Sequence, residues 1–143
     1  MPRMTQAQFN ALQEQFRAFD GSLGKREGRY PNIKRVQLDG YTFASKAEAE
    51  RYLILKAAQL AGSISGLRVH PHYDFRVNGS PVGRGYTADF CYSEMRLSLS
   101  VQIVEDVKGP VERDWPLRRD LFLALYQNRV LLVNGVEVKR RKA

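Results

Sequence analysis

The sequence predicts a mixed α+β fold, because segments with helical and with strand periodicity follow one another along the chain. Three segments repeat apolar residues at three- and four-residue steps, which is typical of helices. Outside these segments, Asp39-Gly40, Asn78-Gly79 and Asn134-Gly135 favour tight β-hairpin turns. The length of 143 residues leaves room for one such domain with its own core.

The first helix is expected over Thr5–Phe19, where four apolar residues form one stripe: Phe9, Leu12, Phe16 and Phe19. The Gly-rich segment that follows has few apolar residues to bury. We therefore expect residues 1–24 to form an accessory helix and tether, and residues 25–143 to form a single domain with a basic C-terminal tail. The stripe suits either packing on the chain's own core or a dimerisation arm.

A hairpin and a second helix are expected next. Asp39-Gly40 stands between apolar residues within residues 36–43, which predicts a type I′ turn. The helix is expected over about Ala47–Ala61 with Ser45 as its N-cap. Glu48 stands where a capping box requires an acid, and Gly62 ends the helical pattern.

The stretch from Leu67 to Lys108 is expected to consist of strands. Asn78-Gly79 predicts a turn between strands over Tyr73–Val77 and Val82–Tyr92. A further turn is expected near Glu94–Arg96. Residues 97–103 then alternate apolar and polar side chains, which predicts a strand with one buried face.

A third helix and a last hairpin complete the predicted order. Asp114-Trp115-Pro116 is a typical helix start, because proline is tolerated in the first turn. We expect this helix to bury a stripe formed by Leu117, Leu121, Phe122 and Leu125. Asn134-Gly135 predicts a hairpin between residues 130–133 and 136–138.

Lys and Arg outnumber Asp and Glu by 23 to 15, so the formal charge is +8. Such an excess favours a polyanionic partner, nucleic acid before an anionic membrane. With no run of about 18 apolar residues and no secretion signal, we expect a cytoplasmic protein without a membrane partner. The candidate phosphate contacts lie in the loop, the third helix and the tail: Lys25, Arg26, Arg29, Lys34, Arg35, Arg118, Arg119, Lys139, Arg140 and Arg141.

Two acids and a lysine are expected to meet at the ends of neighbouring strands. Asp106 and Lys108 share one face of their strand, while the apolar face of residues 97–103 continues to Glu105. Asp89 lies on the preceding strand, and antiparallel neighbours are about 4.8 Å apart. Two carboxylates beside an ammonium group suit metal-dependent phosphodiester hydrolysis, because carboxylates hold Mg²⁺ and the metal activates water.

This register makes Asp106, and not Glu105, the metal ligand of the adjacent acidic pair. The carboxylate of Glu105 is then expected to reach solvent or a basic neighbour. A bulge between Ile103 and Asp106 would reverse the assignment, because one extra residue exchanges the two faces. The Asp-x-Lys pattern is also common as a surface ion pair.

Four other residues favour structural interpretations. His70 and His72, which flank Pro71, are expected to end a strand rather than to bind a metal. Cys91 is expected to be a small buried side chain, and Trp115 to pack in the core rather than to stack on a base.

The order of an acid on a helix, Asp on a strand and acid-x-Lys on the next strand resembles the PD-(D/E)xK nuclease superfamily. The matching pieces are Val36–Gly40, Phe43–Ala49, Tyr86–Phe90, Val104–Gly109 and Leu121-Phe122, within roughly Arg29–Val138. More closely, the chain resembles a family of small phage and prophage proteins akin to junction-resolving phage endonucleases. Two positions depart from the superfamily pattern: Ala88 precedes Asp89 in place of Pro, and Asp106 replaces the more usual Glu.

The resemblance implies a restriction-endonuclease-like core, with a central mixed sheet flanked by helices. It implies that Glu48, Asp89 and Asp106 bind the metal together with the Val107 carbonyl, and that Lys108 is the catalytic lysine. For Glu48, the capping box is a rival interpretation. The implied cofactor is Mg²⁺, with Mn²⁺ expected to substitute, and no small-molecule cofactor is expected.

We therefore expect a metal-dependent endonuclease that acts on DNA in the bacterial host cytoplasm. Branched DNA, such as a Holliday junction in phage recombination or replication, is the expected substrate class. A homodimer would supply the two active sites that junction resolution needs. The alternative is a catalytically silent nucleic-acid-binding protein that keeps the fold and the charge.

Overall fold

The computed structural model describes Ala7, Asn10 and residues 35–107 and 113–141. The predicted helix Thr5–Phe19 therefore lies almost entirely outside the described residues. The predicted catalytic lysine, Lys108, also lies outside them, as do four of the candidate basic residues: Lys25, Arg26, Arg29 and Lys34. The chain divides into two units, residues 1–64 and residues 65–143, and each is considered by itself.

The first unit contains the predicted hairpin and helix. Strand β1 (Val36–Leu38) pairs antiparallel with β2 (Tyr41–Phe43). The turn residues Asp39 and Gly40 have φ angles of 50° and 80°, as a type I′ turn requires. Helix α2 (Lys46–Leu60) follows and begins one residue earlier than expected.

The hairpin of the first unit is attached to α2 by aromatic and polar contacts. The ring of Tyr52 lies 5.1 Å from that of Phe43 and 5.7 Å from that of Tyr41. The Tyr52 hydroxyl and the Lys56 ammonium donate to the Asp39 carboxylate at 2.9 and 2.5 Å. The hydrogen bond from Lys56, followed by that from Tyr52, lowers the pKa of Asp39. Asp39, the first residue of the turn, thus connects the hairpin to α2.

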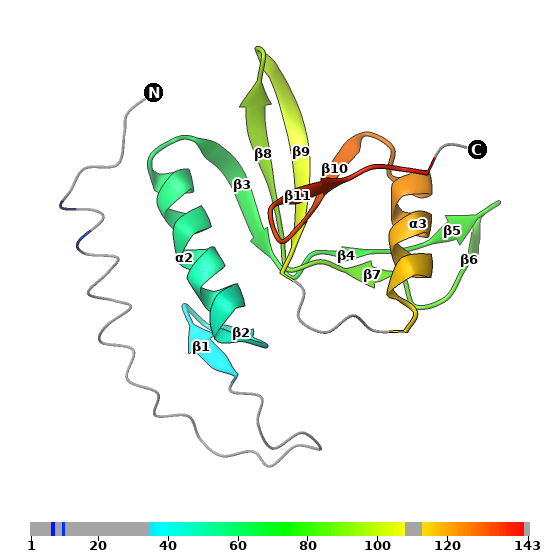
Figure 1. Ribbon diagram of the computed structural model, residues 1–143, viewed down its shortest axis with the longest axis horizontal. Coiled ribbons are helices and arrows are strands. Elements are labelled where there is room, and N and C mark those ends of the chain that lie inside the picture. Colours follow the sequence, from blue (N-terminus) through cyan, green and yellow to red (C-terminus); the bar gives the residue numbers. More distant parts are fainter. Residues whose placement is uncertain (1–6, 8–9, 11–34, 108–112, 142–143) are drawn as a thin grey trace. The chain divides into compact units, whose positions relative to one another are not determined.

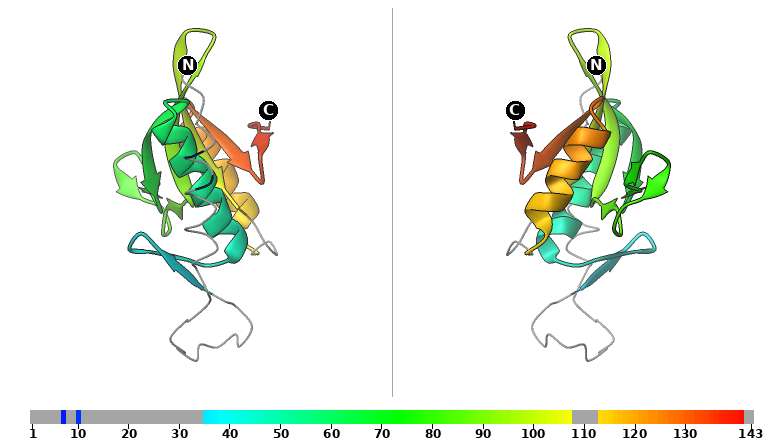
Figure 2. Two further views of the ribbon diagram at one scale, coloured as in Figure 1. Left: turned by 90° about the vertical axis from the view of Figure 1, so that its left-hand side faces the viewer. Right: turned by 90° about the vertical axis from the view of Figure 1, so that its right-hand side faces the viewer.

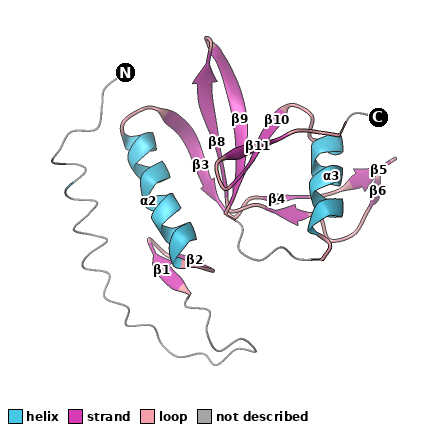
Figure 3. Cartoon of the chain, viewed as in Figure 1, coloured by secondary structure: helices cyan, strands magenta, loops and turns pink. Residues whose placement is uncertain are grey.

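The second unit is built on a five-stranded mixed sheet with the strand order β11-β10-β9-β8-β3 (Figure 1). These strands are β3 (Ile64–Val69), β8 (Phe90–Arg96), β9 (Leu99–Asp106), β10 (Arg129–Val133) and β11 (Val136–Val138). Strands β9 and β10 are parallel, and the β8–β9 and β10–β11 pairs are antiparallel. Helix α3 (Trp115–Leu125) lies between β9 and β10 in the chain, as the crossover of a parallel pair requires (Figure 3). The α+β prediction is confirmed.

Four short strands lie between β3 and β8. Strand β4 (His72–Tyr73) pairs with β7 (Tyr86–Thr87), and β5 (Arg76–Val77) pairs with β6 (Ser80–Pro81). The predicted turn at Asn78-Gly79 is confirmed, with φ angles of 50° and 79°. The two longer strands predicted around it are wrong. Gly83 and Gly85 have φ angles of 62° and 72°, and this left-handed backbone interrupts an extended strand.

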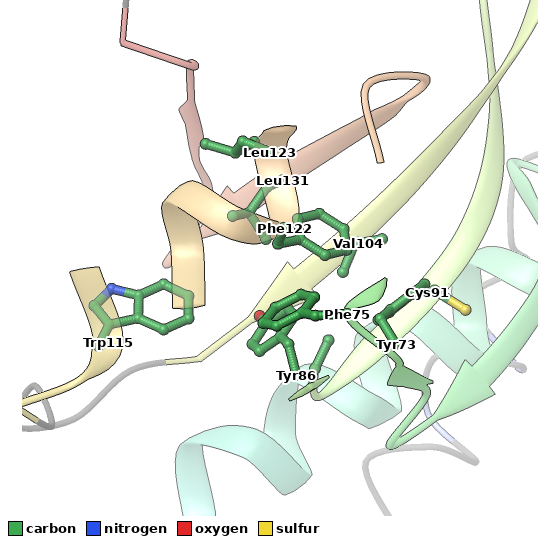
Figure 4. Packing of buried hydrophobic residues seen from close by; sticks show 10 residues of the cluster. Tyr73, Phe75, Tyr86, Cys91, Val104, Trp115, Phe122, Leu123 and Leu131 are labelled. Atoms are coloured by element: carbon green, nitrogen blue, oxygen red, sulfur yellow. The ribbon is translucent and has the colours of Figure 1, made fainter. Parts of the chain in front are cut away.

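One hydrophobic cluster fills the space between α3 and the sheet of the second unit (Figure 4). Its members are Tyr73, Phe75, Tyr86, Ala88, Cys91, Val104, Trp115, Phe122, Leu123 and Leu131. The structural interpretations of Cys91 and Trp115 are confirmed, since both are buried here.

The predicted apolar stripe of α3 is wrong in part. Phe122 is fully buried, but Leu117 is 64% exposed and Leu125 is 39% exposed. Trp115 anchors the start of the buried face, and Leu117 lies two residues later, about 200° around the helix axis. Leu123, which the stripe omits, is buried in place of these leucines.

The turn between β8 and β9 lies at Leu97-Ser98, not near Glu94–Arg96 as predicted. The two turn residues have φ angles of 47° and 64°, and Arg96 pairs with Leu99. The turn end of this ribbon projects beyond α3 (Figure 2). Leu97 is 98% exposed and Leu99 is 69% exposed, so the predicted buried face is absent at this end of β9.

None of the helices in the described part of the chain is long and apolar enough to cross a membrane. The longest helix among the described residues, α2, has 15 residues, whereas a span needs about 20.

Candidate metal and catalytic site

The strand register places Glu105 and Asp106 on opposite faces of the sheet. Cys91 pairs with Val104, and both side chains belong to the cluster under α3. Asp106 lies two residues after Val104 and so shares this face, whereas Glu105 pairs with Phe90 on the other face. The pairing is continuous along β9, so the prediction of the register without a bulge is confirmed.

The environment of Glu105 differs from the prediction. Its side chain is buried, with 2% exposure, and its carboxylate accepts a hydrogen bond from the Tyr92 hydroxyl at 2.8 Å. The expectation that this carboxylate reaches solvent or a basic neighbour is therefore wrong. The physical reason is that both faces of the sheet are covered at this end of β9, so a polar side chain needs an internal partner.

Asp106 is also 2% exposed, and hydrogen bonds hold both its side chain and its backbone. Its carboxylate oxygen Oδ2 accepts from the Tyr86 hydroxyl at 2.5 Å, and its backbone carbonyl accepts from the Asn134 N–H at 3.0 Å. Burial, followed by the negative charges of Asp106 and Asp89, raises the pKa of Tyr86, so the hydroxyl stays protonated and donates. Both acidic groups thus act on one hydroxyl.

Asp89 lies in a bend directly before β8 and is half-buried. Its Oδ2 accepts from the Val107 N–H at 2.6 Å, and its own N–H donates to the Glu105 carbonyl at 3.1 Å. Its carbonyl accepts from the His70 N–H at 2.8 Å. Asp89 is therefore fixed between the ends of β3 and β9, beside the backbone that follows Asp106.

His70 lies in this region although the sequence did not indicate it as a site residue. The prediction that the His-Pro-His segment ends a strand is confirmed, because β3 ends at Val69. A ring nitrogen of His70 nevertheless lies within 4.8 Å of a carboxylate oxygen of Asp89. A histidine after a strand is a weak signal, and only the pairing of β3 with β8 reveals this proximity.

Two further predicted site residues are considered separately. Glu48 belongs to the first unit, where its N–H donates to the Ser45 hydroxyl at 3.2 Å and its carboxylate accepts from the Ala44 N–H at 2.8 Å. These are the bonds of a capping motif, one residue displaced from the usual box, and they account for a structural role. Its role as a metal ligand stays a prediction, as does that of Lys108, which lies outside the described residues.

Several of the predicted phosphate contacts have acidic partners. Arg118 forms an ion pair with Asp114 at 2.7 Å, and the Arg118 hydrogen bond lowers the pKa of Asp114. Arg119 and Arg141 lie 3.1 and 3.9 Å from the carboxylate of Asp120. These acids offset part of the positive charge at the start of α3. Arg35, in the first unit, is exposed.

A basic pocket lies at the start of β10, whereas Asp106 pairs with Val133 at the end of that strand. It encloses about 340 Å³ and is lined by Leu123, Gln127, Arg129, Val130, Glu137, Val138, Lys139 and Arg140. Arg129, which the sequence did not indicate, lies over the rings of Tyr73 and Tyr126 at 5.8 and 5.6 Å. Three cations against one carboxylate make this pocket suited to an anionic group.

The sequence comparison assigns the chain to a family. Residues 28–139 match the family described as "Protein of unknown function (DUF1064)", and the chain belongs to this family. No curated protein and no solved structure matches the chain.

Proposed function

We propose that this protein is a metal-dependent endonuclease that hydrolyses DNA phosphodiester bonds on a core of the PD-(D/E)xK type. One observation carries the proposal: the Asp89 carboxylate bonds to the Val107 N–H, beside the segment Asp106-Val107-Lys108. The superfamily pattern requires an aspartate and an acid-x-Lys motif at the ends of neighbouring strands, and strands β8 and β9 are neighbours.

The donors in this region fit Mg²⁺ or Mn²⁺. The Asp89 and Asp106 carboxylates and the Val107 carbonyl are oxygen ligands, which these hard cations prefer. A carboxylate has about four acceptor positions, so the same group can accept a hydrogen bond and bind a cation. In this proposal Glu48 is the further acidic ligand.

The roles of the chain's own groups follow from their contacts. The Tyr86 hydroxyl orients the Asp106 carboxylate, and the Val107 N–H orients that of Asp89. Lys108 is proposed to orient the attacking water or the scissile phosphate. A bound cation lowers the pKa of its water and stabilises the charge that develops on the phosphate oxygens.

The charge of the chain supports DNA as the substrate. Arg129, in the basic pocket, pairs with Gln102, and Val133 pairs with Asp106. The pocket therefore lies four residues, or roughly 13 Å, along the strands from Asp106. A nucleic-acid backbone running along this sheet would contact Arg129, Lys139 and Arg140 at one end and the proposed metal at the other. Branched DNA and a homodimer are the proposed substrate class and assembly.

The first experiment is cleavage of supercoiled plasmid by the full chain with and without Mg²⁺. We expect nicking that requires the metal and that is lost in Asp89→Asn. Asp74→Asn is a matched control, because its side chain is 72% exposed in the same unit, and it should cut normally. Wild-type protein that does not cut with either Mg²⁺ or Mn²⁺ would exclude an endonuclease. Labelled four-way junction, flap, duplex and single-stranded DNAs then define the preferred substrate.

The alternative is a catalytically silent DNA-binding protein. The observation that favours it is the burial of Asp106, whose carboxylate is already bonded to Tyr86. Such a protein would bind DNA without cutting it. Its affinity would fall with salt, with a log–log slope of about −0.9 for each phosphate contacted.

A further inference from the structure

We propose that His70 is a cation ligand together with Asp89, and that this mixed nitrogen–oxygen pair gives the protein a preference for first-row transition ions over Mg²⁺. The inference rests on the proposed function for the use of the ion in catalysis. The binding of the ion itself is a separate property and is tested without DNA.

The distance between the two groups suits one shared ion. A ring nitrogen of His70 lies within 4.8 Å of a carboxylate oxygen of Asp89. Two ligands on opposite sides of one ion are separated by about 4.2 Å, since each metal–ligand bond is about 2.1 Å long. A small side-chain adjustment therefore brings both donors onto the same cation.

The backbone holds the two residues beside each other. The His70 N–H donates to the Asp89 carbonyl at 2.8 Å, and the Ala88 N–H donates to the Pro71 carbonyl at 3.0 Å. Two consecutive residues after β3 are thus tied to the two residues before β8. Such a rigid frame is what a precise ligand pair requires, because loosely held ligands lose affinity.

The backbone of His70 is itself unusual. Its φ angle is 52°, in the left-handed region that non-glycine residues seldom adopt. This conformation turns the chain sharply between β3 and Pro71 and keeps the imidazole next to the bend that carries Asp89. Strained residues of this kind are concentrated at functional sites.

The nature of the donors predicts the metal. Carboxylate and carbonyl oxygens alone favour Mg²⁺, whereas imidazole favours later first-row ions, whose affinity rises from Mn²⁺ through Fe²⁺ to Co²⁺ and Ni²⁺. We therefore expect the site that contains His70 to bind Co²⁺ and Mn²⁺ more tightly than Mg²⁺.

His72 provides a matched control on the same segment. Its Nδ1 lies 2.7 Å from the Thr87 hydroxyl, and its Nε2 lies 3.3 Å from the Asp74 carboxylate. Its side chain is 49% exposed. Replacing His72 removes an imidazole two residues away and leaves the His70–Asp89 pair intact.

The experiment is calorimetric titration of the metal-free full chain with Co²⁺, Mn²⁺ and Mg²⁺. In the wild-type chain, Co²⁺ should bind at least about tenfold more tightly than Mg²⁺, and pulsed EPR of bound Mn²⁺ should detect a coordinated imidazole nitrogen. His70→Asn, which tolerates a positive φ angle, should lose this advantage and the nitrogen signal. His70→Asp should give an all-oxygen site that binds Mg²⁺ more tightly than the wild-type site does. His72→Asn should behave as wild type.

The inference is overturned if His70→Asn keeps the Co²⁺ affinity and the nitrogen signal, or if His72→Asn loses them equally. Circular dichroism and thermal unfolding check that each variant is folded. Failure of the nuclease proposal gives a different result: a wild-type chain that binds Co²⁺ through His70 and cuts no DNA. Conversely, His70→Asn could leave both the Mg²⁺-dependent cleavage and the Co²⁺ affinity unchanged. That result would contradict the proposed role of His70 and leave the nuclease proposal standing.

Discussion

At the Leu99 end of β9, apolar and polar residues alternate regularly, and yet the side chains are exposed or half-buried. At the Asp106 end, the four consecutive residues from Ile103 are all buried. The difference lies in what surrounds each end. Leu99 pairs only with Arg96 of β8, while from Gln102 onward the strand also pairs with β10. Regular alternation thus marks a ribbon that extends beyond the core, and its loss marks the covered centre of the sheet.

The largest effect is expected at the covered end, from Asp106→Asn. Loss of a carboxylate ligand should lower Mg²⁺-dependent plasmid cleavage by more than about 100-fold. Mutation of a residue that only orients a metal ligand typically costs about 10- to 100-fold, and loss of the ligand itself should cost more. DNA binding should persist or strengthen, because a negative charge near phosphate is removed. Glu105→Gln, on the opposite face, should retain most of the activity. If Glu105→Gln were inactive and Asp106→Asn cut DNA normally, the metal ligand would be Glu105 and not Asp106.

Substitutions at the two ends of β9 should also differ in their effect on the free energy of unfolding. Ile103 is fully buried, so Ile103→Ala should lower the free energy of unfolding by about 2–5 kcal/mol. Leu99→Ala, at a side chain that is 69% exposed, should change it by less than about 0.5 kcal/mol. Chemical denaturation measures both. Equal losses would mean that the exposed end of the ribbon is covered in solution, for example by a second chain.

Two buried tyrosines allow the two faces of the covered end to be compared. Tyr86→Phe and Tyr92→Phe each remove a hydroxyl that donates to a carboxylate, and each should cost about 1–3 kcal/mol of stability. Only Tyr86→Phe should also weaken metal binding, by about 10- to 100-fold, because only Tyr86 orients Asp106. Calorimetric titration with Mn²⁺ tests this, and an equal loss in Tyr92→Phe would contradict it.

A modest stabilising effect is expected at the exposed turn. Leu97 and Ser98 both have positive φ angles, which cost non-glycine residues about 1–2 kcal/mol each. Replacing the pair by Asn-Gly, the preferred type I′ sequence, should therefore raise the unfolding free energy by about 1 kcal/mol. Ser100→Gly, within β9, should lower it instead. A destabilised Asn-Gly variant would indicate that Leu97 makes a stabilising contact.

Local chemistry accounts for the elements that the sequence predicted well. The turns at Asp39-Gly40, Asn78-Gly79 and Asn134-Gly135 all have the expected positive φ angles, because these residue pairs tolerate that backbone wherever they occur. The Ser45 cap and the beginning of α2 follow in the same way from side-chain hydrogen bonds to neighbouring backbone groups. The opposite faces of Glu105 and Asp106 needed only the two-residue period of a strand.

The turn at Leu97-Ser98, the exposure of Leu117 and the burial of Glu105 could not be predicted, because each depends on what packs around the residue. The same holds for the candidate site. The sequence indicated Asp89 and Asp106 from strand order. It did not indicate Tyr86 or Arg129, which contact Asp106 and Tyr73 at 20 or more residues' distance along the chain.

By itself, the sequence determined the α+β class, the basic charge, the tight turns and the side of β9 on which Asp106 lies, because these depend on composition and on neighbours along the chain. The tertiary structure alone decided which end of β9 is covered and that His70 lies beside Asp89. Both depend on the pairing of strands far apart in sequence: β10 reaches only one end of β9, and the end of β3 is bonded to the bend before β8. No local pattern encodes such pairings, because they join strands that lie far apart in the sequence and depend on packing that forms only in the folded chain.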